Sequence, residues 1–507
     1  MAESWATLGI DLHLEPTGSG GLRRGLTDAL RDAVRTGRLA PGTRLPSSRT
    51  LATDLGIARN TVADAYADLV AEGWLTARQG SGTRVATGIP APAGGAGGTG
   101  GTGGAGGAGG GTGATTATTA IGVAGATGAA GVAKAPGTTA PAPRRRVPER
   151  PTHNLTPGTP DLAAFPRTEW LKAARRALAA APNDALGYGD PRGRPELRTA
   201  LAGYLARSRG VRADPGNIMV CAGFVHGLEI LARVLRARGA RTVAVESYGL
   251  FIHRDRLTSA GLAIPPLPYD ERATDTRAVP DAGAVLLTPA HQFPMGTALH
   301  PDRRAAVVEW ARRTGGLVLE DDYDGEFRYD RQPVGALQGL DPDHVVYLGT
   351  ASKSLAPGLR LGWMVLPPSL VDECAAAKGH SDGCGVLDQL TLADFLTSGA
   401  YDRQVRSARL RYRNRRDALV AALAARAPEV HVTGIAAGLH AVLRLPPGTE
   451  RSVVQAAAWQ GLALHGLSTY RHVQADTAPL DALVVGYGTP PDHAWTAALE
   501  ALCRVLP

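Results

Sequence analysis

The sequence predicts two folded modules of different class: a small helical module closed by a β-hairpin, and a large α/β module with a mainly parallel sheet. Residues 88–150 are almost pure Gly, Ala and Thr before the basic end "RRRVPERP". Such a segment has too few large apolar side chains to offset the entropy of folding. After it, short β-branched runs alternate with helical patterns. We therefore expect a first module over 1–87, a flexible linker over 88–150 and a large domain over 151–507.

The composition excludes several classes of protein. Of the 507 residues, 44% are apolar and 20% are charged, as is usual for soluble globular proteins. No apolar run approaches the roughly 20 residues that span a bilayer, and the N-terminus lacks the pattern of a secretory signal. We expect a cytoplasmic protein that has no membrane partner. Neither a metal site nor a disulfide framework is expected from the scattered cysteines Cys221, Cys374, Cys384 and Cys503.

The small module has the pattern of a helix-turn-helix followed by a hairpin. A first helix is expected to end near Gly37, and Ser47 or Ser48 can cap a second helix, "SRTLATDL", which Gly56 ends. The strands "GWLTAR" and "TRVA" flank the turn "QGSG". The intervening "RNTVADAYADLVAEG" predicts a third helix, with an apolar face made of Val62, Tyr66, Leu69 and Val70. This order of elements is typical of a winged helix-turn-helix.

A winged helix of this kind can read DNA. The second helix of the pair enters the major groove with its N-terminal residues at the base edges, and those residues are Arg59, Asn60 and Thr61. Arg49 would reach the backbone or a guanine, and Gly80 in the wing can approach a phosphate closely. The alternative is a winged helix that contacts only proteins and has solvated arginines. The cluster of donor-rich residues favours double-stranded DNA as the partner.

The large module contains short, buried-type strands. Parallel sheets display ligand-binding groups at the carboxyl ends of their strands, so the residues after each run are candidate site residues. The expected strands are "RTVAVE" (241–246), "AVLLTP" (284–289), "GLVLED" (316–321) and "HVVYLG" (344–349).

One lysine is notable in "GTASKSLAPGLRLGW" (349–363), directly after the last of these strands. The chain has 54 lysines and arginines, and only four of them are lysines, which leaves 50 arginines (54 − 4). Lys353 could be a surface lysine or a phosphate ligand, but the P-loop glycine pattern is absent. The third possibility is a Schiff base, for which arginine cannot substitute because only an amine condenses with an aldehyde. Pyridoxal phosphate is the cofactor that such a lysine predicts.

Pyridoxal phosphate makes further demands that the sequence can meet. Its ring nitrogen needs a carboxylate, for which Asp321 in "GLVLEDDYDGEF" is the first choice and Asp322 the second. Tyr323 could bind the phenolic oxygen. A carboxylate cluster of this kind is otherwise a solvated strand end or a divalent-metal site.

The phosphate and the ring require other partners. The phosphate needs cationic and hydroxyl groups together with a helix N-terminus, and the ring needs a neighbour from the turn "TPAHQFPMG", either His291 or Gln292. The candidate phosphate ligands are Arg360, Thr350 and Ser352, with the backbone amides of Gly223, Phe224 and Val225.

Both modules resemble one known family. "LPSSRTLATDLGIARNTVADAYADLVAEGWL" resembles the DNA-binding domain of GntR-type transcriptional regulators, whose DNA contacts match Arg49, Arg59, Thr61 and Gly80. Residues 153–505 resemble a fold-type I aminotransferase domain. Four motifs are similar to the MocR subgroup, in which such a domain follows a GntR-type reader: "YGDPRGRPELRTALAGYLARSRG", "TPAHQFPMG", "EDDYDGEFRY" and "GTASKSLAPGLRLGW".

The resemblance implies an α/β large domain and a small domain mainly over 375–507. It implies that Lys353 carries the internal aldimine of pyridoxal phosphate and that Asp321 pairs with the pyridine nitrogen. The phenolic oxygen and the phosphate would be bound by Tyr323, Thr350 and Arg360. A head-to-tail homodimer is also implied.

Two departures from the family pattern leave roles open. The family usually has "E-D-P-x-Y" where this chain has "ESYGLFIHR". Tyr248 is our first choice to stack on the cofactor ring; the alternatives are Phe251 and the loss of stacking in this chain. Aminotransferases bind a substrate carboxylate with an arginine near the C-terminus, but "ALVVGYGTP" (482–490) has none. Arg471 is the nearest candidate for an effector carboxylate, unless it is only a surface charge.

The sequence therefore predicts a DNA-binding transcriptional regulator that senses pyridoxal phosphate, or an amine or amino acid that reacts with it. The alternative is an active aminotransferase with an appended DNA-binding domain. The missing carboxylate arginine disfavours efficient transamination.

Overall fold

The computed structural model describes residues 22–35, 39, 42–55, 57–78, 82–86, 151–329, 334–379 and 383–507. The predicted linker (88–150), the wing glycine Gly80, and the two helix-ending glycines Gly37 and Gly56 lie outside the described residues. Among the described residues, no helix combines the length and the apolar character needed to cross a bilayer.

The N-terminal module has the predicted winged-helix order. Helices α1 (Leu22–Arg35), α2 (Ser48–Leu55) and α3 (Arg59–Ala71) are followed by an antiparallel hairpin of β1 (Leu75–Arg78) and β2 (Gly82–Val85). Ser47 caps α2, because its Oγ accepts a hydrogen bond from the Thr50 amide at 3.2 Å.

The module has a hydrophobic core of its own. Val62, Tyr66 and Leu69 of α3 are buried together with residues of α1 and the hairpin. The Tyr66 hydroxyl donates a hydrogen bond to the Pro46 carbonyl at 3.1 Å, which ties α3 to the segment before α2. The prediction that Val70 belongs to this face was wrong, since its side chain is exposed. Val70 follows Leu69 directly and therefore points about 100° away from it around the helix.

In the described part of the large domain, seven strands form the central sheet. Their spatial order is β4 (Ile218–Cys221), β12 (Gly362–Val365), β11 (Val345–Thr350), β10 (Leu317–Asp322), β9 (Ala284–Leu287), β5 (Val243–Glu246) and β6 (Pro266–Leu267). The four strands expected from the sequence are β5, β9, β10 and β11, and they pair in parallel. Strand β12 is antiparallel to β11 and β4.

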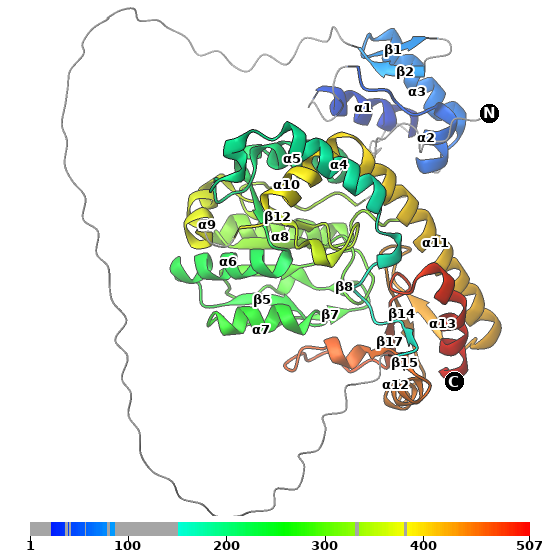
Figure 1. Ribbon diagram of the computed structural model, residues 1–507. Helices are drawn as coiled ribbons and strands as arrows, with labels where there is room; N and C mark the ends of the chain where they lie inside the picture. The colour runs from blue at the N-terminus through cyan, green and yellow to red at the C-terminus, as the bar shows by residue number, and fades with distance from the viewer. Residues whose placement is uncertain are drawn as a thin grey trace, which may run out of the picture. The chain divides into compact units, whose positions relative to one another are not determined.

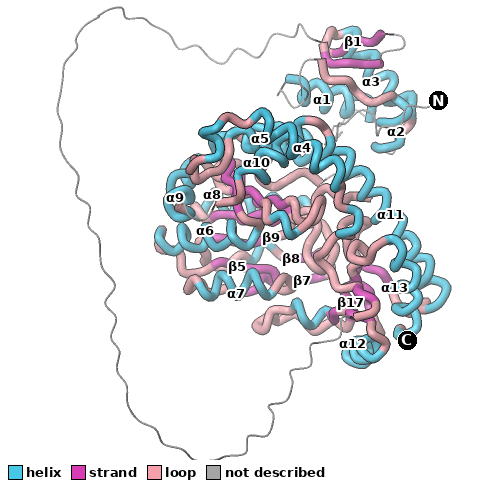
Figure 2. The backbone as a smooth tube through the Cα atoms, in the orientation of Figure 1, coloured by secondary structure: helices cyan, strands magenta, loops and turns pink. Residues whose placement is uncertain are grey.

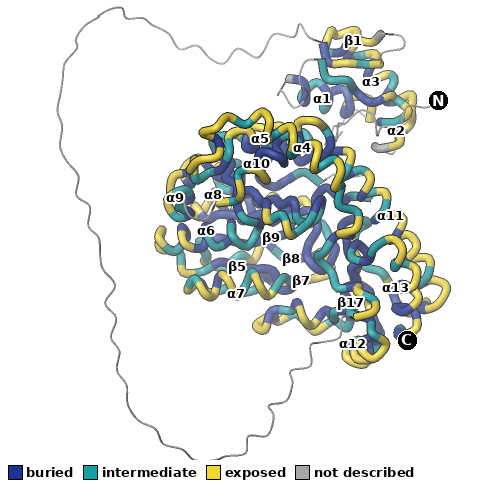
Figure 3. Tube along the Cα trace, viewed as in Figure 1, coloured by how far each residue is buried: buried dark blue, intermediate teal, exposed yellow. Residues whose placement is uncertain are grey.

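Helices cover both faces of this sheet, and the strands between them are buried (Figure 3). Alternate residues face opposite layers: Leu319 packs in one core and Val318 in another. The first layer contains α6 (Phe224–Ala237), α7 (Phe251–Ser259) and α9 (Val371–Lys378). The second contains α4 (Arg167–Ala180), α5 (Pro195–Arg209), α8 (Pro301–Thr314) and α10 (Val386–Thr397). Figure 1 shows α4, α5 and α10 grouped together, and Figure 2 shows the strands among these helices.

A small subdomain is built on an antiparallel sheet with the order β13 (His431–Thr433), β14 (Ala441–Arg444), β17 (Ala482–Val485) and β16 (His465–Gly466). The long helix α11 (Ala400–Arg426) packs with it, as do α12 (Glu450–Trp459) and α13 (Asp492–Val505). Strand β3 (His153–Asn154) pairs with β15 (Leu462–Ala463), so the first residues of the large domain also belong here. A short hairpin of β7 (Tyr269–Asp270) and β8 (Ala273–Thr274) lies outside both sheets.

The small subdomain differs in extent from the predicted 375–507. Position 375 lies inside α9, and Leu392 and Phe395 of α10 pack in the core of the large sheet. The core of the small subdomain starts within α11, at Ala408, and includes Leu155. The helical pattern of the sequence cannot show this division, because it gives the apolar face of a helix but not the neighbour that covers it.

Candidate functional site

Lys353 lies in the turn that follows β11, beside a cavity of about 270 Å³. The strand ends β5, β9, β10 and β11 contribute Glu246, Thr288, Asp321 and Thr350 to the lining. The amino ends of α6 and α7 form another wall. The cavity therefore lies at the carboxyl ends of the parallel strands, where ligands bind in α/β sheets.

Lys353 is half-buried, and its amine lies close to acidic groups. Its Nζ donates a hydrogen bond to the Gly158 carbonyl at 2.5 Å. Burial lowers the pKa of Lys353, while Asp321 and Asp324 oppose this change. Burial therefore favours the uncharged amine, which is the form that attacks a carbonyl carbon.

Strand β10 carries three consecutive acids, and the structure gives them different surroundings. Glu320 accepts two backbone N–H groups. Asp322 pairs with Arg209, whose Nε lies 2.6 Å from Asp322 Oδ2, and it accepts the Tyr347 hydroxyl at 2.8 Å. Asp321 points to the other face and lines the cavity, where its buried Oδ1 has no hydrogen-bond partner among the described residues. Asp322 is thus fully engaged, and Asp321 is the carboxylate that remains available.

Asp321 is strongly destabilised as a carboxylate. Burial raises its pKa well above the usual range; Lys353 opposes this, and Asp322, Asp324 and Glu246 add to it. A buried oxygen without a partner costs free energy until a donor reaches it. The protonated ring nitrogen of pyridoxal phosphate is such a donor, so this orphaned oxygen fits the cofactor.

An anion cradle lies at the start of α6. Gly223 caps this helix with φ 85°, and a Cβ at this position would lie 3.3 Å from Arg360 Nη1. Arg360 has φ 52° and its Nη2 donates to the Ala222 carbonyl at 2.6 Å. A non-glycine residue in the left-handed region is uncommon and is often found at functional sites. A guanidinium beside open helix amides suits a phosphate group.

The other predicted phosphate ligands border the same cavity. The Thr350 and Ser352 hydroxyl oxygens lie 2.8 Å apart, and both residues line the cavity, as do Phe224 and Val225 at the first turn of α6.

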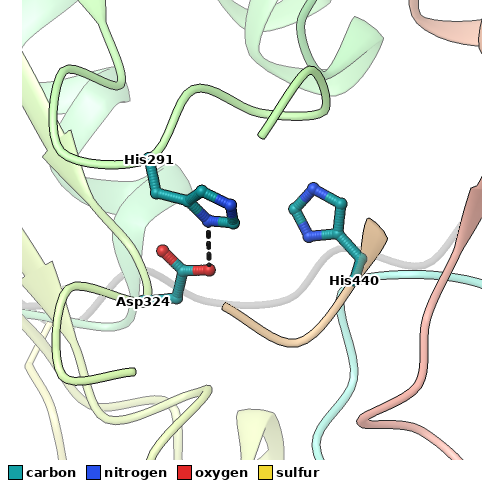
Figure 4. Close-up of side chains that lie close together, drawn as sticks. All are labelled: His291, Asp324 and His440. Carbon is teal, nitrogen blue, oxygen red and sulfur yellow. Dashed lines mark hydrogen bonds and ion pairs between the residues drawn. The ribbon is translucent and has the colours of Figure 1, made fainter. Parts of the chain in front are cut away.

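Tyr323 lines the cavity and rests on a buried polar cluster, part of which is drawn in Figure 4. Its hydroxyl lies 3.0 Å from His291 Nδ1, which lies 2.9 Å from Asp324 Oδ2. Burial, and then Asp324 and Asp321, raise the pKa of Tyr323 well above its usual range, so the phenol keeps its proton. His440, also at the cavity wall, donates from Nε2 to the Pro294 carbonyl at 3.0 Å.

His291 therefore lies behind Tyr323 and does not reach the cavity wall itself. Gln292 also points elsewhere, since its Nε2 donates to Thr274 Oγ1 at 2.8 Å. Within the described residues, His291, Asp324 and His440 place one ligand-type atom each within 4.8 Å of one another.

The favoured stacking residue was predicted wrongly. Tyr248 is fully buried and packs edge-on against Tyr269, with ring centroids 5.6 Å apart, and it does not line the cavity. The alternative, Phe251, is 43% exposed and also lies outside the lining. The structure instead brings Leu250 to the cavity wall.

A pair of rings that the sequence argument missed also borders the cavity. Phe224 and His253 line it together, with ring centroids 4.4 Å apart. The pKa of His253 falls to about 3, because burial and the nearby Lys353 and Arg254 disfavour its charged form. This wall of the cavity is therefore made of one apolar ring and one neutral imidazole.

Arg471, the candidate for an effector carboxylate, lies elsewhere. Its Nη2 donates to the carbonyls of Ala475 and Thr477 at 2.5 and 2.6 Å, and it does not line the cavity. The cavity does contain Arg254, which the sequence argument missed. In a chain with 50 arginines (54 − 4), the residue type alone could not single out Arg254. Its position shortly after the predicted strand "VAVE" was the remaining signal in the sequence.

In the N-terminal module, Arg59 and Asn60 are exposed at the start of α3, Thr61 is half-buried, and Arg49 is exposed at the start of α2. Ala58, the N-cap of α3, provides no side-chain acceptor for the first-turn amides. These amides and the arginine are donors of the kind that phosphates and base edges accept.

Two family models match the chain. Residues 22–85 match "Bacterial regulatory proteins, gntR family", and residues 151–473 match "Aminotransferase class I and II". The chain is 32% identical over 466 residues to the "HTH-type pyridoxine biosynthesis transcriptional regulator PdxR" of Corynebacterium glutamicum, covering 92% of this chain and 91% of the relative. It is 33% identical over 482 residues to the "Probable rhizopine catabolism regulatory protein MocR" of Rhizobium meliloti, covering 92% and 90%.

Solved structures share the fold of the large domain. An archaeal alanine:glyoxylate aminotransferase superposes with a TM-score of 0.63 at 23% identity, over 70% of this chain and 90% of the enzyme. The Pyrococcus horikoshii kynurenine aminotransferase gives a TM-score of 0.62 at 25% identity, over 69% and 90%.

These matches confirm the predicted fold classes, a winged helix-turn-helix and a fold-type I aminotransferase-like domain. They also support pyridoxal phosphate as the cofactor, which the lysine, the orphaned carboxylate and the anion cradle fit. The chain belongs to the gntR family of bacterial regulatory proteins, in the MocR-type group that carries a class I and II aminotransferase domain.

Proposed function

We propose that this protein regulates transcription by binding promoter DNA through its winged helix and by sensing pyridoxal phosphate, or an amine or amino acid that reacts with it. The observation that carries the proposal is the Lys353 amine in one cavity with the unpartnered Asp321 oxygen, in a chain that also contains a DNA reader. Because a DNA reader must reach the chromosome, we place the protein in the cytoplasm.

Each cavity group has a distinct task in this proposal. When bound, pyridoxal phosphate supplies an aldehyde that condenses with amines and a ring that absorbs visible light. Lys353 provides the amine, Asp321 accepts a hydrogen bond from the ring nitrogen, and Tyr323 donates to the phenolic oxygen. Arg360 and the first amides of α6 bind the phosphate, with the neighbouring hydroxyls of Thr350 and Ser352.

Sensing requires two states of the protein with different affinities for the ligand, because a ligand shifts an equilibrium only by that difference. Titration of pyridoxal phosphate and a panel of amines into a promoter-binding assay, with visible absorbance recorded, tests the proposal. We expect the absorbance change and the change in DNA affinity to occur over the same ligand concentrations. A DNA affinity that stays constant while the absorbance shows that the cavity is saturated would contradict the proposal.

An active aminotransferase is the second candidate, and the burial that favours the uncharged amine of Lys353 supports it. Steady turnover of an amino donor and a keto acid would establish this activity. The engagement of Arg471 by two carbonyls disfavours it, since a substrate carboxylate must then find another cation.

We propose that the protein is a head-to-tail homodimer, as the family resemblance implies. Tyr188 is fully exposed, and Leu171, Leu178 and Leu186 are also exposed. Exposed large apolar side chains gathered in one short segment are typical of an interface. Sedimentation at micromolar concentration should give twice the mass of the chain, and Leu178→Asp should shift the protein toward the monomer. A monomeric wild type would contradict the dimer.

A matched pair of substitutions on β10 separates the cofactor role from the structural role. Asp321→Asn should weaken pyridoxal phosphate binding by about 10- to 100-fold, because a charge-assisted hydrogen bond is lost. Its thermal stability should stay unchanged or rise, since an unpartnered buried carboxylate is removed. Asp322→Asn leaves Arg209 buried without its ion pair and should cost about 3–5 kcal/mol of unfolding free energy. Cofactor titration measures the first effect and thermal melts measure the second. If Asp322→Asn lost cofactor affinity and Asp321→Asn lost stability, the two roles would be exchanged.

A further inference from the structure

Arg254 is a cation in the cavity wall for which the cofactor provides no partner. Its side chain extends from α7, and its Nη1 donates to the carbonyls of Gly249 at 3.2 Å and Tyr470 at 3.0 Å. The Gly249 amide in turn donates to the Tyr470 carbonyl at 3.0 Å. The guanidinium is therefore held between the loop after β5 and a segment beside the small sheet. In the described part of the chain no carboxylate forms an ion pair with it.

The charges that line the cavity leave Arg254 in excess. The lining cations are Lys353, Arg254 and Arg360, and the lining acids are Asp321 and Glu246. In the proposed function, Arg360 faces the phosphate, Lys353 holds the aldehyde and Asp321 faces the ring nitrogen.

The other acidic group in the cavity lining does not compensate Arg254 fully, and Asp255, which raises the pKa of Arg254 against the effect of burial, is exposed and lies outside the lining. Glu246 is engaged by Thr288, whose hydroxyl donates to it at 2.6 Å, and by Thr274 at 3.1 Å. Burial raises the pKa of Glu246 to about 7, so this carboxyl is only about half ionised at neutral pH, and the pKa of His253 falls to about 3, so its imidazole is neutral. One guanidinium thus remains for a ligand that is not the cofactor.

Arg254 is better placed than Arg471 to bind the carboxylate of an effector. An arginine binds a carboxylate best when a planar pair of N–H groups is free. Arg471 donates hydrogen bonds from Nη2 to two carbonyls outside the cavity. Arg254 uses Nη1 for its two carbonyl contacts, and the structure assigns no partner from the described residues to Nε or Nη2.

We propose that Arg254 binds the carboxylate of the effector, and that the effector is therefore an amino acid, with an amine for the cofactor and a carboxylate for Arg254. This inference rests on the proposed function. A sensor of the cofactor alone, or of simple amines, would have no use for the guanidinium.

The test compares amino acids with amines that differ from them only by the carboxylate. The holoprotein is titrated with glycine, β-alanine, 4-aminobutyrate and 5-aminovalerate, and with the matched methylamine, ethylamine, propylamine and butylamine. The readout is the concentration that half-saturates the visible absorbance change. We expect at least one amino acid to be preferred over its amine by about 10- to 100-fold in the wild type, as for a hydrogen bond between charged groups. Arg254→Gln should remove this preference, and Arg254→Lys should keep part of it.

Two controls make the result specific. Arg256→Gln removes the same charge from the exposed face of the same helix, where Arg256 pairs with Glu229 at 3.3 Å, and should leave the preference unchanged. Pyridoxal phosphate affinity should stay within about threefold in Arg254→Gln, because the phosphate lies with Arg360.

Each contrary result has a separate meaning. Equal responses of the wild type to amino acids and amines would overturn this inference, as would a preference that survives Arg254→Gln. A large loss of cofactor affinity in Arg254→Gln would make Arg254 a phosphate ligand and would also overturn it. A wild type that binds no cofactor would instead refute the proposed function.

Discussion

Replacing Lys353 by alanine should abolish the visible absorbance of the cofactor-supplemented protein. The ε-amine is the group in the cavity that can bond covalently to an aldehyde, and alanine removes it. Lys353→Arg should lose the absorbance equally, because a guanidinium keeps the positive charge but does not condense. Absorbance spectra after gel filtration check this outcome. Cofactor that stays bound without the covalent bond, through contacts of its phosphate with Arg360, is measured separately by its fluorescence.

Lys172→Ala is the matched control for this experiment. Lys172 lies on the surface and pairs with Glu169 at 2.8 Å, so its loss removes a lysine without touching the cavity. The control should retain full absorbance and full DNA binding. A colourless wild type, or a Lys353→Ala variant that stays as coloured as the control, would contradict the role of Lys353.

Arg59→Ala should weaken binding to the protein's own promoter region on the order of 10- to 100-fold per DNA reader. The side chain is exposed at the first turn of α3, where recognition helices contact base edges, and one bidentate base contact contributes about 1–3 kcal/mol. Mobility-shift titrations at fixed ionic strength measure the loss. The visible spectrum should not change.

Arg24→Ala provides the comparison, since Arg24 is an exposed arginine on α1 and its loss changes the net charge by the same amount. We expect it to weaken binding at most severalfold and without regard to sequence, as for a distant phosphate contact. If both variants bind equally well, α3 is not the recognition helix.

The central sheet could be predicted from sequence because its strands are buried on both faces. β5, β9, β10 and β11 are short apolar runs that end in polar residues, and parallel pairing places those ends together. Lys353 and Asp321 follow from the same logic. Strand β12 was not foreseen, because its four residues, "GWMV", follow the lysine turn too closely to show a period of their own.

The side walls of the cavity could not be predicted in the same way. Tyr248, His253 and Arg254 lie close together in sequence, but only the last two line the cavity. Their directions depend on the start of α7 at Phe251 and on the contacts between the Ser247–Gly249 and Tyr470–His472 segments. Those contacts join residues more than 200 positions apart, and no local pattern reports them.

The alternation of side chains along strand β10 places acids of the core and the acid of the ligand site at neighbouring positions. Its three neighbouring acids differ in task because odd and even positions face opposite sides of the sheet. A substitution at one position leaves the other two in place. A single-residue insertion, in contrast, would turn a core ion-pair acid toward the cavity and Asp321 toward the face where Arg209 and Tyr347 lie. This stretch should therefore be most sensitive to changes of length, because an insertion disrupts both the Asp322–Arg209 pair and the ligand site, whereas one substitution disrupts one of them.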